Sequence, residues 1–204
     1  MANSSEIVGA PLTEHTWADF EQVMGPDGGA RGCWCMHWRM TYQQWERGRG
    51  AGNRATMRER AESDPPPGVV CYLDSEPVGW VAIGERSEYP RMQRSPVTKA
   101  IDHAPVWVIS CVYVRRDHRG AGLHAPLIDA ACRFAADQGQ EIVEAVPVEP
   151  AGGKRAGADT AMTGMASAYL AAGFREVARR KSDRPVMRRT LRPVERPVLV
   201  TDRR

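Results

Sequence analysis

The sequence predicts an α/β (α+β) fold in which helices flank a central sheet, and three observations support this. Residues 106–114 form a nearly unbroken run of β-branched and aromatic side chains, typical of a strand buried on both faces. A polar turn with two glycines follows, and residues 122–138 then carry apolar side chains at helical spacing. Two short apolar runs, 69–73 and 78–83, surround a turn and indicate an antiparallel hairpin.

The remaining elements follow from local signals. Thr13 is a candidate cap for a helix that ends at Gly25-Pro26, and its apolar side chains recur at helical spacing. Prolines 65–67 stop any helix, and 85–104 is a polar loop. The predicted order is a strand at 6–8, helices at 13–24, from 41 and at 53–63, the hairpin, the strand at 106–114, the helix at 122–138, a strand at 141–148, a helix at 163–172, and strands at 174–180 and 186–191.

The length and composition favour one domain. The chain has 204 residues, of which 42% are hydrophobic, which is enough for one substantial core. We therefore expect a single domain at residues 1–191 and a C-terminal tail at 192–204. The stretch 151–158, rich in Gly, Ala, Lys and Arg, is interpreted as a mobile loop within that domain.

Charge and cysteine content exclude several classes of protein. The net charge is +3, from 28 basic and 25 acidic residues, so a dedicated nucleic-acid binder is not expected. The longest apolar stretch, 105–114, is too short for a membrane-spanning helix. The five cysteines are odd in number, and the first 15 residues lack a signal-peptide pattern. We expect free thiols in a cytoplasmic protein.

The turn at residues 115–122 has the composition of a diphosphate-binding loop. Glycines let backbone N–H groups approach a phosphate, and the N-terminus of the following helix favours an anion. Gly120, Gly122 and Ala125 also match the dinucleotide pattern GxGxxA, but five polar residues separate the turn from its strand. The other alternative is a simple tight turn with solvated arginines.

Residues 112–123 resemble the coenzyme A signature of the GNAT superfamily of acyltransferases. Arg119 and Gly122 match its first and fourth positions, whereas His124 stands where that family usually has Gly or Ala. The resemblance implies that acetyl-CoA binds here as co-substrate. The residues expected to bind it are Val112, Tyr113, Val114, Arg119, Gly120, Ala121, Gly122, Leu123 and His124.

A second match lies at residues 169–174, which are similar to the Tyr-x-x-x-Gly-Phe of the same superfamily. The resemblance implies that Tyr169 protonates the departing thiolate, although a tyrosine packed in the helix's own core is the alternative. The asparagine often found early in that helix has no counterpart, since Met162, Thr163 and Gly164 occupy the region. The similarity extends over residues 69–191.

The resemblance also implies a fold and a reaction. The sheet would be mixed and mostly antiparallel, and its fourth strand, 106–114, would splay from the strand at 141–148. The pantetheine arm would bind in the splay like an added strand. A neutral amine would then attack the thioester while a backbone N–H holds the oxyanion. Candidate bases are an ordered water or one of four carboxylates: Glu85, Glu88, Glu144 and Glu149.

The segment 33–39 resembles the Cys-Trp-Cys-x-x-Trp-Arg element of an uncharacterised bacterial branch of these enzymes. Trp34, Trp38 and Arg39 are expected to wall the acceptor pocket, and plain packing is the alternative. Cys33, Cys35 and His37 would alternate on one face of an extended strand. Because three ligands do not complete a zinc site, no metal is expected.

These observations predict an N-acetyltransferase that moves an acetyl group from acetyl-CoA to a small-molecule primary amine by direct attack in a ternary complex. Alternatives are acetylation of protein lysines or N-termini, and a non-catalytic homologue that binds acyl-CoA. Nucleic-acid binding through the dispersed arginines is least favoured. The resemblance to the superfamily also implies a homodimer, with apolar residues of the tail segment 194–200 at its interface.

Overall fold

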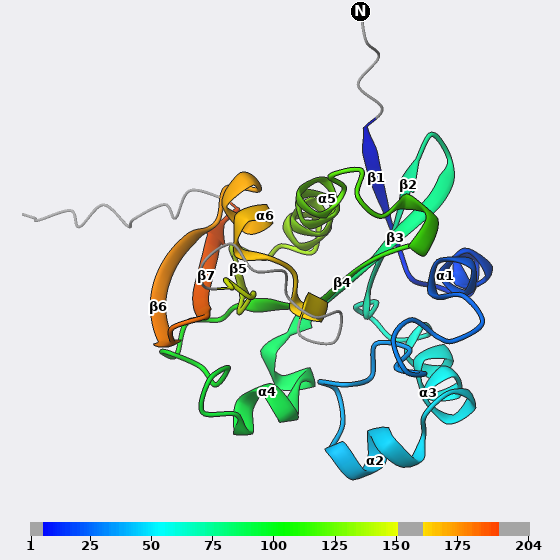
Figure 1. Ribbon diagram of the computed structural model, residues 1–204, viewed down its shortest axis with the longest axis horizontal. Coiled ribbons are helices and arrows are strands. Elements are labelled where there is room, and N and C mark those ends of the chain that lie inside the picture. Colours follow the sequence, from blue (N-terminus) through cyan, green and yellow to red (C-terminus); the bar gives the residue numbers. More distant parts are fainter. Residues whose placement is uncertain (1–5, 151–160, 192–204) are drawn as a thin grey trace, which may run out of the picture.

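The computed structural model describes residues 6–150 and 161–191, and a seven-stranded sheet forms its centre (Figure 1). The strand order is β1-β2-β3-β4-β5-β7-β6, and only β4 and β5 run parallel. The predicted mixed, mostly antiparallel sheet is therefore confirmed. The strands are β1 (Ile7–Pro11), β2 (Gly68–Leu73), β3 (Glu76–Glu85), β4 (Trp107–Val114), β5 (Ile142–Ala145), β6 (Arg175–Lys181) and β7 (Arg184–Thr190).

Helices cover both faces of the sheet. The long helix α5 and the short α6 pack on one face, whereas α1, α2 and α3 lie on the other side (Figure 1). The helices are α1 (Trp17–Met24), α2 (Tyr42–Arg47), α3 (Ala51–Arg60), α4 (Pro90–Arg94), α5 (His124–Asp137) and α6 (Ala166–Ala171). Short 3-10 turns are η1 (Arg86–Glu88), η2 (Arg116–His118) and η4 (Ala161–Thr163). In the described part of the chain, no helix is both long and apolar enough to cross a membrane.

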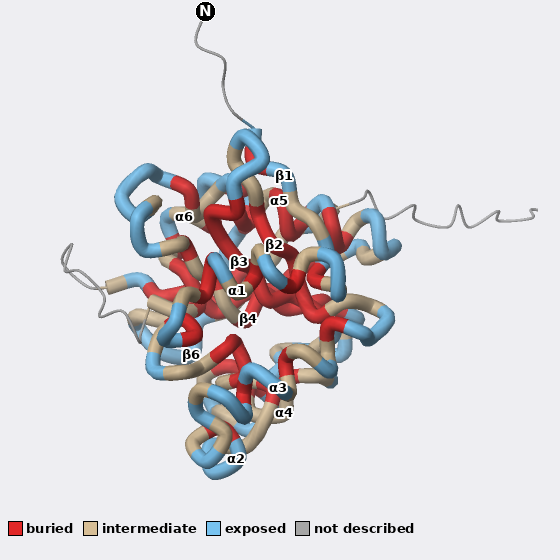
Figure 2. Tube along the Cα trace, turned by 90° about the vertical axis from the view of Figure 1, so that its right-hand side faces the viewer, coloured by how far each residue is buried: buried red, intermediate tan, exposed pale blue. Residues whose placement is uncertain are grey.

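Strand β4 lies at the centre of the fold, because each of its two faces packs into a different hydrophobic core. Ile109 and Val112 pack toward α5, whereas Cys111 and Tyr113 face the cluster around α1. In that second cluster the Phe20 ring meets Trp80 of β3 edge-on at 4.7 Å. Burying a side chain of this size contributes about 1.5–3 kcal/mol. Figure 2 shows the buried residues concentrated along these central strands.

The sheet splays open between β4 and β5, as expected. Their ladder has three pairs and ends at Ile109↔Ala145, while β4 continues to Val114 along β3. The predicted strand at 141–148 is accordingly shorter, because the chain leaves the sheet after Ala145. Val148 pairs instead with Met165, just before α6. The last five residues of β4 thus have no described strand on this side.

Several predicted boundaries were wrong. The first helix begins at Trp17 rather than after Thr13, since the Thr13 N–H donates to the Thr16 hydroxyl in a preceding turn. The loop 85–104 contains η1 and α4. The segment 33–39 is a series of turns and not a strand, with Trp34 and Cys35 at φ 46° and 57°. The predicted mobile loop 151–158 and the tail 192–204 with its segment 194–200 lie outside the described residues.

Candidate active site

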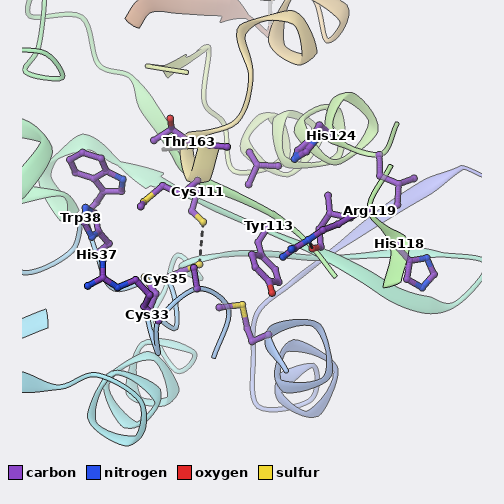
Figure 3. Close-up of a pocket in the computed structure, with 18 of the residues that line it drawn as sticks. Cys33, Cys35, His37, Trp38, Cys111, Tyr113, His118, Arg119, His124 and Thr163 are labelled. Atoms are coloured by element: carbon purple, nitrogen blue, oxygen red, sulfur yellow. Dashed lines mark hydrogen bonds between the residues drawn. The ribbon is translucent and has the colours of Figure 1, made fainter. Parts of the chain in front are cut away.

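A cavity of about 740 Å³ opens beside the splayed end of β4. Its walls come from the turns before α2 and from α2 itself, from β4, from the loop between β4 and α5, and from η4 and the start of β7. Figure 3 shows the cysteines of the cavity between two groups, with His37 and Trp38 on one side and Tyr113, Arg119 and His124 on the other. A volume of this size is typical of a small-molecule site.

The loop between β4 and α5 forms one end of the cavity. Gly120 and Gly122 have φ of 86° and 74°, a region that L side chains rarely adopt. Both glycines line the cavity, as do Leu123 and His124 at the start of α5. Helix α5 has no acidic residue in its first turn, so nothing there competes with an anion for the helix N-terminus. The geometry suits a diphosphate.

The three arginines of this loop have different surroundings. Arg115 donates hydrogen bonds to Glu76, Asp117 and the Pro77 carbonyl, so these contacts already hold its guanidinium. The Arg116 side chain is 79% exposed. Arg119 lines the cavity, where its Nε donates to the Val114 carbonyl at 3.2 Å and its guanidinium lies 5.3 Å from the Tyr113 ring centre. Only Arg119 is positioned to meet a ligand in the cavity.

His124 is the departure from the superfamily pattern, and it lines the cavity. Burial and the charge of Arg119 together lower the pKa of its imidazole below the usual value. The ring is therefore neutral at physiological pH in the ligand-free protein. A neutral imidazole with one N–H can still donate a hydrogen bond to a phosphate oxygen.

Most of the residues expected to bind the coenzyme come together in this half of the cavity. Val112, Tyr113 and Val114 line it from the open edge of β4, next to Arg119 and the two glycines. Ala121 is not among the lining residues. Because β4 has no described strand partner here on the side of β5, an extended ligand can lie along that side as an added strand.

Aromatic side chains form the other half of the cavity. The rings of Trp38, Tyr42 and Trp45 line it together with His37, whose ring lies 4.9 Å from Trp38 and 5.2 Å from Trp45. Arg91 holds His37 from outside, because its Nη1 lies 3.2 Å from Nδ1 and donates to the His37 carbonyl. Arginine is always a donor, so Nδ1 accepts and the imidazole proton is on Nε2.

Three thiols lie between these two halves. Cys33, Cys35 and Cys111 all line the cavity, and the sulfurs of Cys35 and Cys111 are 3.4 Å apart (Figure 3). Burial raises the pKa of both Cys33 and Cys35, so these thiols stay protonated. No group of three or more metal-ligating side chains in the described residues has a geometry that could hold a metal ion.

Trp34 and Arg39 do not lie where the sequence suggested. Neither lines the cavity, whereas Trp38 does. Trp34 is buried in the core against Trp17 and Phe20, with ring centres 6.4 and 5.9 Å away. The Arg39 side chain is fully buried, pairs with Glu88 and donates to the Pro67 carbonyl at 2.7 Å and the Tyr89 hydroxyl at 2.8 Å. Of the three expected wall residues, only Trp38 reaches the pocket.

Tyr169 lies behind the wall of the cavity. Its side chain is fully buried, its ring packs edge-on against Phe174 at 5.0 Å, and its hydroxyl donates to the Thr163 carbonyl at 3.0 Å. Burial raises the pKa of this hydroxyl well above its usual value. This arrangement corresponds to the packing alternative, although Thr163, the residue that the hydroxyl holds, lines the cavity.

The four carboxylates considered as general bases are all outside the cavity. Glu144 is fully buried between Arg86 and Arg188, and Glu88 pairs with Arg39 and Arg60. Glu149 pairs with Arg179, and Glu85 is exposed next to Ser87. The sequence also missed several lining residues, among them Tyr42, Trp45, Cys111, Thr163 and Arg184. Cys111 carried a signal, since it alternates with Tyr113 along the predicted strand.

Comparison with known families agrees with this geometry. The model of the acetyltransferase (GNAT) family matches residues 35–156, more than half of the chain. The chain therefore belongs to the acetyltransferase (GNAT) family. It is an acyltransferase, and acetyl-CoA is its acyl donor. A search of curated proteins gave no match.

Solved structures of the same fold cover nearly the whole chain. A GNAT-family acetyltransferase from Listeria monocytogenes 4b F2365 is 12% identical, with a TM-score of 0.52 over 93% of this chain and 98% of the other. The aminoglycoside N-acetyltransferase AAC(6')-Ib11 is 15% identical, with a TM-score of 0.52 over 91% and 96%. An acetyltransferase from Thermus thermophilus is 19% identical, with a TM-score of 0.49 over 91% and 97%. At these identities the likeness concerns the fold.

Proposed function

We propose that the protein is an N-acetyltransferase that acetylates the primary amine of a small molecule by direct attack in a ternary complex. The observation that carries this proposal is a single cavity with two unlike halves. One half is the glycine loop and the free edge of β4, and the other is a pocket walled by Trp38, Tyr42 and Trp45. Both substrates therefore have room at once, and they meet near Cys111.

Two of the three thiols at that meeting point are unsuited to form a covalent acetyl-enzyme intermediate. Burial raises the pKa of the Cys33 and Cys35 thiols, so neither supplies a thiolate nucleophile at neutral pH. The free edge of β4 offers backbone N–H groups where an oxyanion would develop. Since the four nearby carboxylates are outside the cavity, we propose that water carries the proton away from the amine.

The test is a thiol-release assay with acetyl-CoA over a panel of small primary amines and of peptides with a free lysine or N-terminus. We expect turnover with at least one small amine and none with the peptides, since a pocket of about 740 Å³ has limited room for a peptide. Turnover with peptides alone would favour the protein-acetylating alternative. Stabilisation by acetyl-CoA without turnover on any amine would favour a non-catalytic binding homologue.

We also propose that Tyr169 donates the proton to the departing thiolate. Its hydroxyl is protonated at neutral pH, since burial raises its pKa, and it donates to Thr163, which lines the cavity as Cys111 does. To reach the thiolate it must exchange its bond to the Thr163 carbonyl. We expect Tyr169→Phe to lower kcat about 100-fold, the lower end of general acid catalysis, with an unchanged KM for acetyl-CoA.

Steady-state kinetics with two acyl donors checks this assignment. An acetyl thioester with a more acidic leaving thiol needs no proton donor, so it should restore most of the kcat lost in Tyr169→Phe. If the substitution instead raises KM for acetyl-CoA and the acidic thioester restores nothing, Tyr169 only positions Thr163. If Tyr113→Phe lowers kcat and the acidic thioester restores it, while Tyr169→Phe shows neither effect, the proton donor is Tyr113 on the cavity wall.

We also propose where the protein is located and how it assembles. All five cysteines are free thiols, which suits a reducing cytoplasm. We propose a cytoplasmic homodimer, in keeping with the superfamily. Light scattering of the full chain and of a chain ending at residue 191 would test the contribution of the tail to assembly.

A further inference from the structure

Arg184 is a charged side chain on the cavity wall that the proposed chemistry does not use. It is the first residue of β7 and lines the cavity together with Thr163. In the part of the chain that the structure describes, its guanidinium forms neither a hydrogen bond nor an ion pair. Arg119, by contrast, is held by the Val114 carbonyl and the Tyr113 ring.

An arginine in this setting favours an anionic ligand group. Burial lowers the pKa of Arg184, yet a guanidinium remains charged at any physiological pH. Asp183 attracts this charge but forms no hydrogen bond or ion pair with it among the described residues, so an incoming anion can still compensate the partly desolvated guanidinium. The planar guanidinium fits a carboxylate best, because two parallel N–H groups can bond its two oxygens.

The position of Arg184 distinguishes this anion from the phosphates of the coenzyme. The carbonyl of Asp183, just before Arg184, accepts from the Glu149 N–H at 2.9 Å, and the neighbouring Val148 N–H donates to the Gly164 carbonyl. Arg184 therefore lines the cavity next to the segment of Thr163, which lies on the Trp38 side in Figure 3. The phosphate loop is at the other side of Cys111, around Arg119 and His124 (Figure 3). A group held by Arg184 therefore lies near the acetyl group and not near the diphosphate.

The rest of the wall on the Trp38 side of the cavity suits a flat apolar group of the ligand. Trp38, Tyr42 and Trp45 present rings, and Cys33 and Cys35 add polarisable sulfur. Among the described lining residues none is Asp or Glu, whereas three are arginines. Such a wall opposes a ligand with several positive charges, because no described carboxylate is there to pair with them.

We infer that the acceptor is an amino acid or a close analogue: a primary amine that carries a carboxylate, held by Arg184, and an apolar or aromatic body against the rings. This inference rests on the proposed function. In the reaction the amine nitrogen forms an amide bond to the acetyl carbon and the carbon–sulfur bond breaks. The amine loses one proton, the coenzyme thiolate gains one, and the products are an N-acetyl amino acid and coenzyme A.

The test compares an aromatic acceptor with and without its carboxylate, and adds a polyamine. L-Phenylalanine, its amide, phenethylamine and spermidine would be assayed by thiol release with the wild type and with Arg184→Met. In the wild type we expect kcat/KM for phenylalanine to exceed that for the amide at least tenfold. In Arg184→Met that preference should fall about 10- to 100-fold, through KM for phenylalanine, while the amide and phenethylamine are unaffected.

Matched variants separate this role from the alternatives. Arg175→Met, at the exposed start of β6, should leave the preference intact, and Arg184→Lys should retain part of it. A kcat loss shared by all acceptors would mean that Arg184 stabilises the thiolate or oxyanion, and a raised KM for acetyl-CoA would assign it to the coenzyme; either result overturns the inference. Turnover of spermidine alone would also overturn it while leaving the proposed function standing. Stabilisation by acetyl-CoA with no turnover on any amine would instead mean that the proposed function fails.

Discussion

Replacing Gly122 with valine is expected to abolish the stabilisation of the protein by acetyl-CoA. Gly122 has φ of 74°, and a Cβ at this position meets nothing within 4 Å, so the side chain would extend into the space where a phosphate approaches the backbone. A ligand that binds only the native state stabilises it by about 2.7 kcal/mol at 100 times its Kd. Thermal unfolding with and without excess acetyl-CoA should show a shift for the wild type and none for the variant.

Gly139→Val is the matched control for backbone strain. Gly139 follows the end of α5, has φ of 82°, and also has nothing within 4 Å of a built Cβ. Each substitution forces valine into a left-handed conformation, at a cost on the order of 1–3 kcal/mol. The control should lose stability but keep the full shift with acetyl-CoA. A retained shift in Gly122→Val, or a lost shift in both, would contradict the assignment of the phosphate loop.

The glycine-loop half of the cavity, to which we assign the coenzyme, could be predicted because its signals are local. A buried strand, a glycine turn and an amphipathic helix lie within about 30 consecutive residues, and each has its own sequence pattern. Gly120 and Gly122 must be glycine for the turn they form, so their position along the chain also fixes their position in space. The sheet order beyond this unit came from the resemblance and not from the pattern.

The aromatic half of the cavity was not predictable, because it depends on contacts between distant segments. The alternation expected for residues 33–39 requires an extended backbone, but Trp34 and Cys35 adopt positive φ, which their side chains do not signal. Trp34 therefore turns into the core while Trp38 reaches the cavity. Arg39 is drawn into a buried pair with Glu88, 49 residues away in the sequence. Nothing near either residue in the sequence indicates these partners.

The surroundings of Arg184 and Tyr169, on the other side of the cavity, also could not be predicted from the sequence. The motif located Tyr169 correctly at the end of α6, but its hydroxyl is directed to Thr163 by the packing of the ring against Phe174. Arg184 is one of several arginines in the last two strands, and only the splay between β4 and β5 brings it to the cavity. The surroundings of these two side chains therefore depend on the topology of the sheet, which the neighbouring sequence does not indicate.

Glu144 was considered as a base, and its surroundings suggest a structural role. The side chain is 0% exposed, whereas those of its partners Arg86 and Arg188 are 13% and 14% exposed. Arg188 also pairs with the half-exposed Asp102. The carboxylate thus neutralises two arginines at the point where β5 joins β7, next to the splay that forms the cavity.

Glu144→Gln should therefore destabilise the fold by about 3 kcal/mol, because removing one member of a buried ion pair leaves its partners charged and uncompensated. Asp102→Asn breaks an exposed contact of the same Arg188 and should cost much less stability, because solvent screens that pair. Urea unfolding of both variants measures the difference, and acetyl-CoA should still stabilise each, since neither residue lines the cavity. Equal and small losses in the two variants would mean that solvent already screens Glu144. A Glu144→Gln protein with native stability and no turnover would indicate that the Glu144 carboxylate takes part in the reaction.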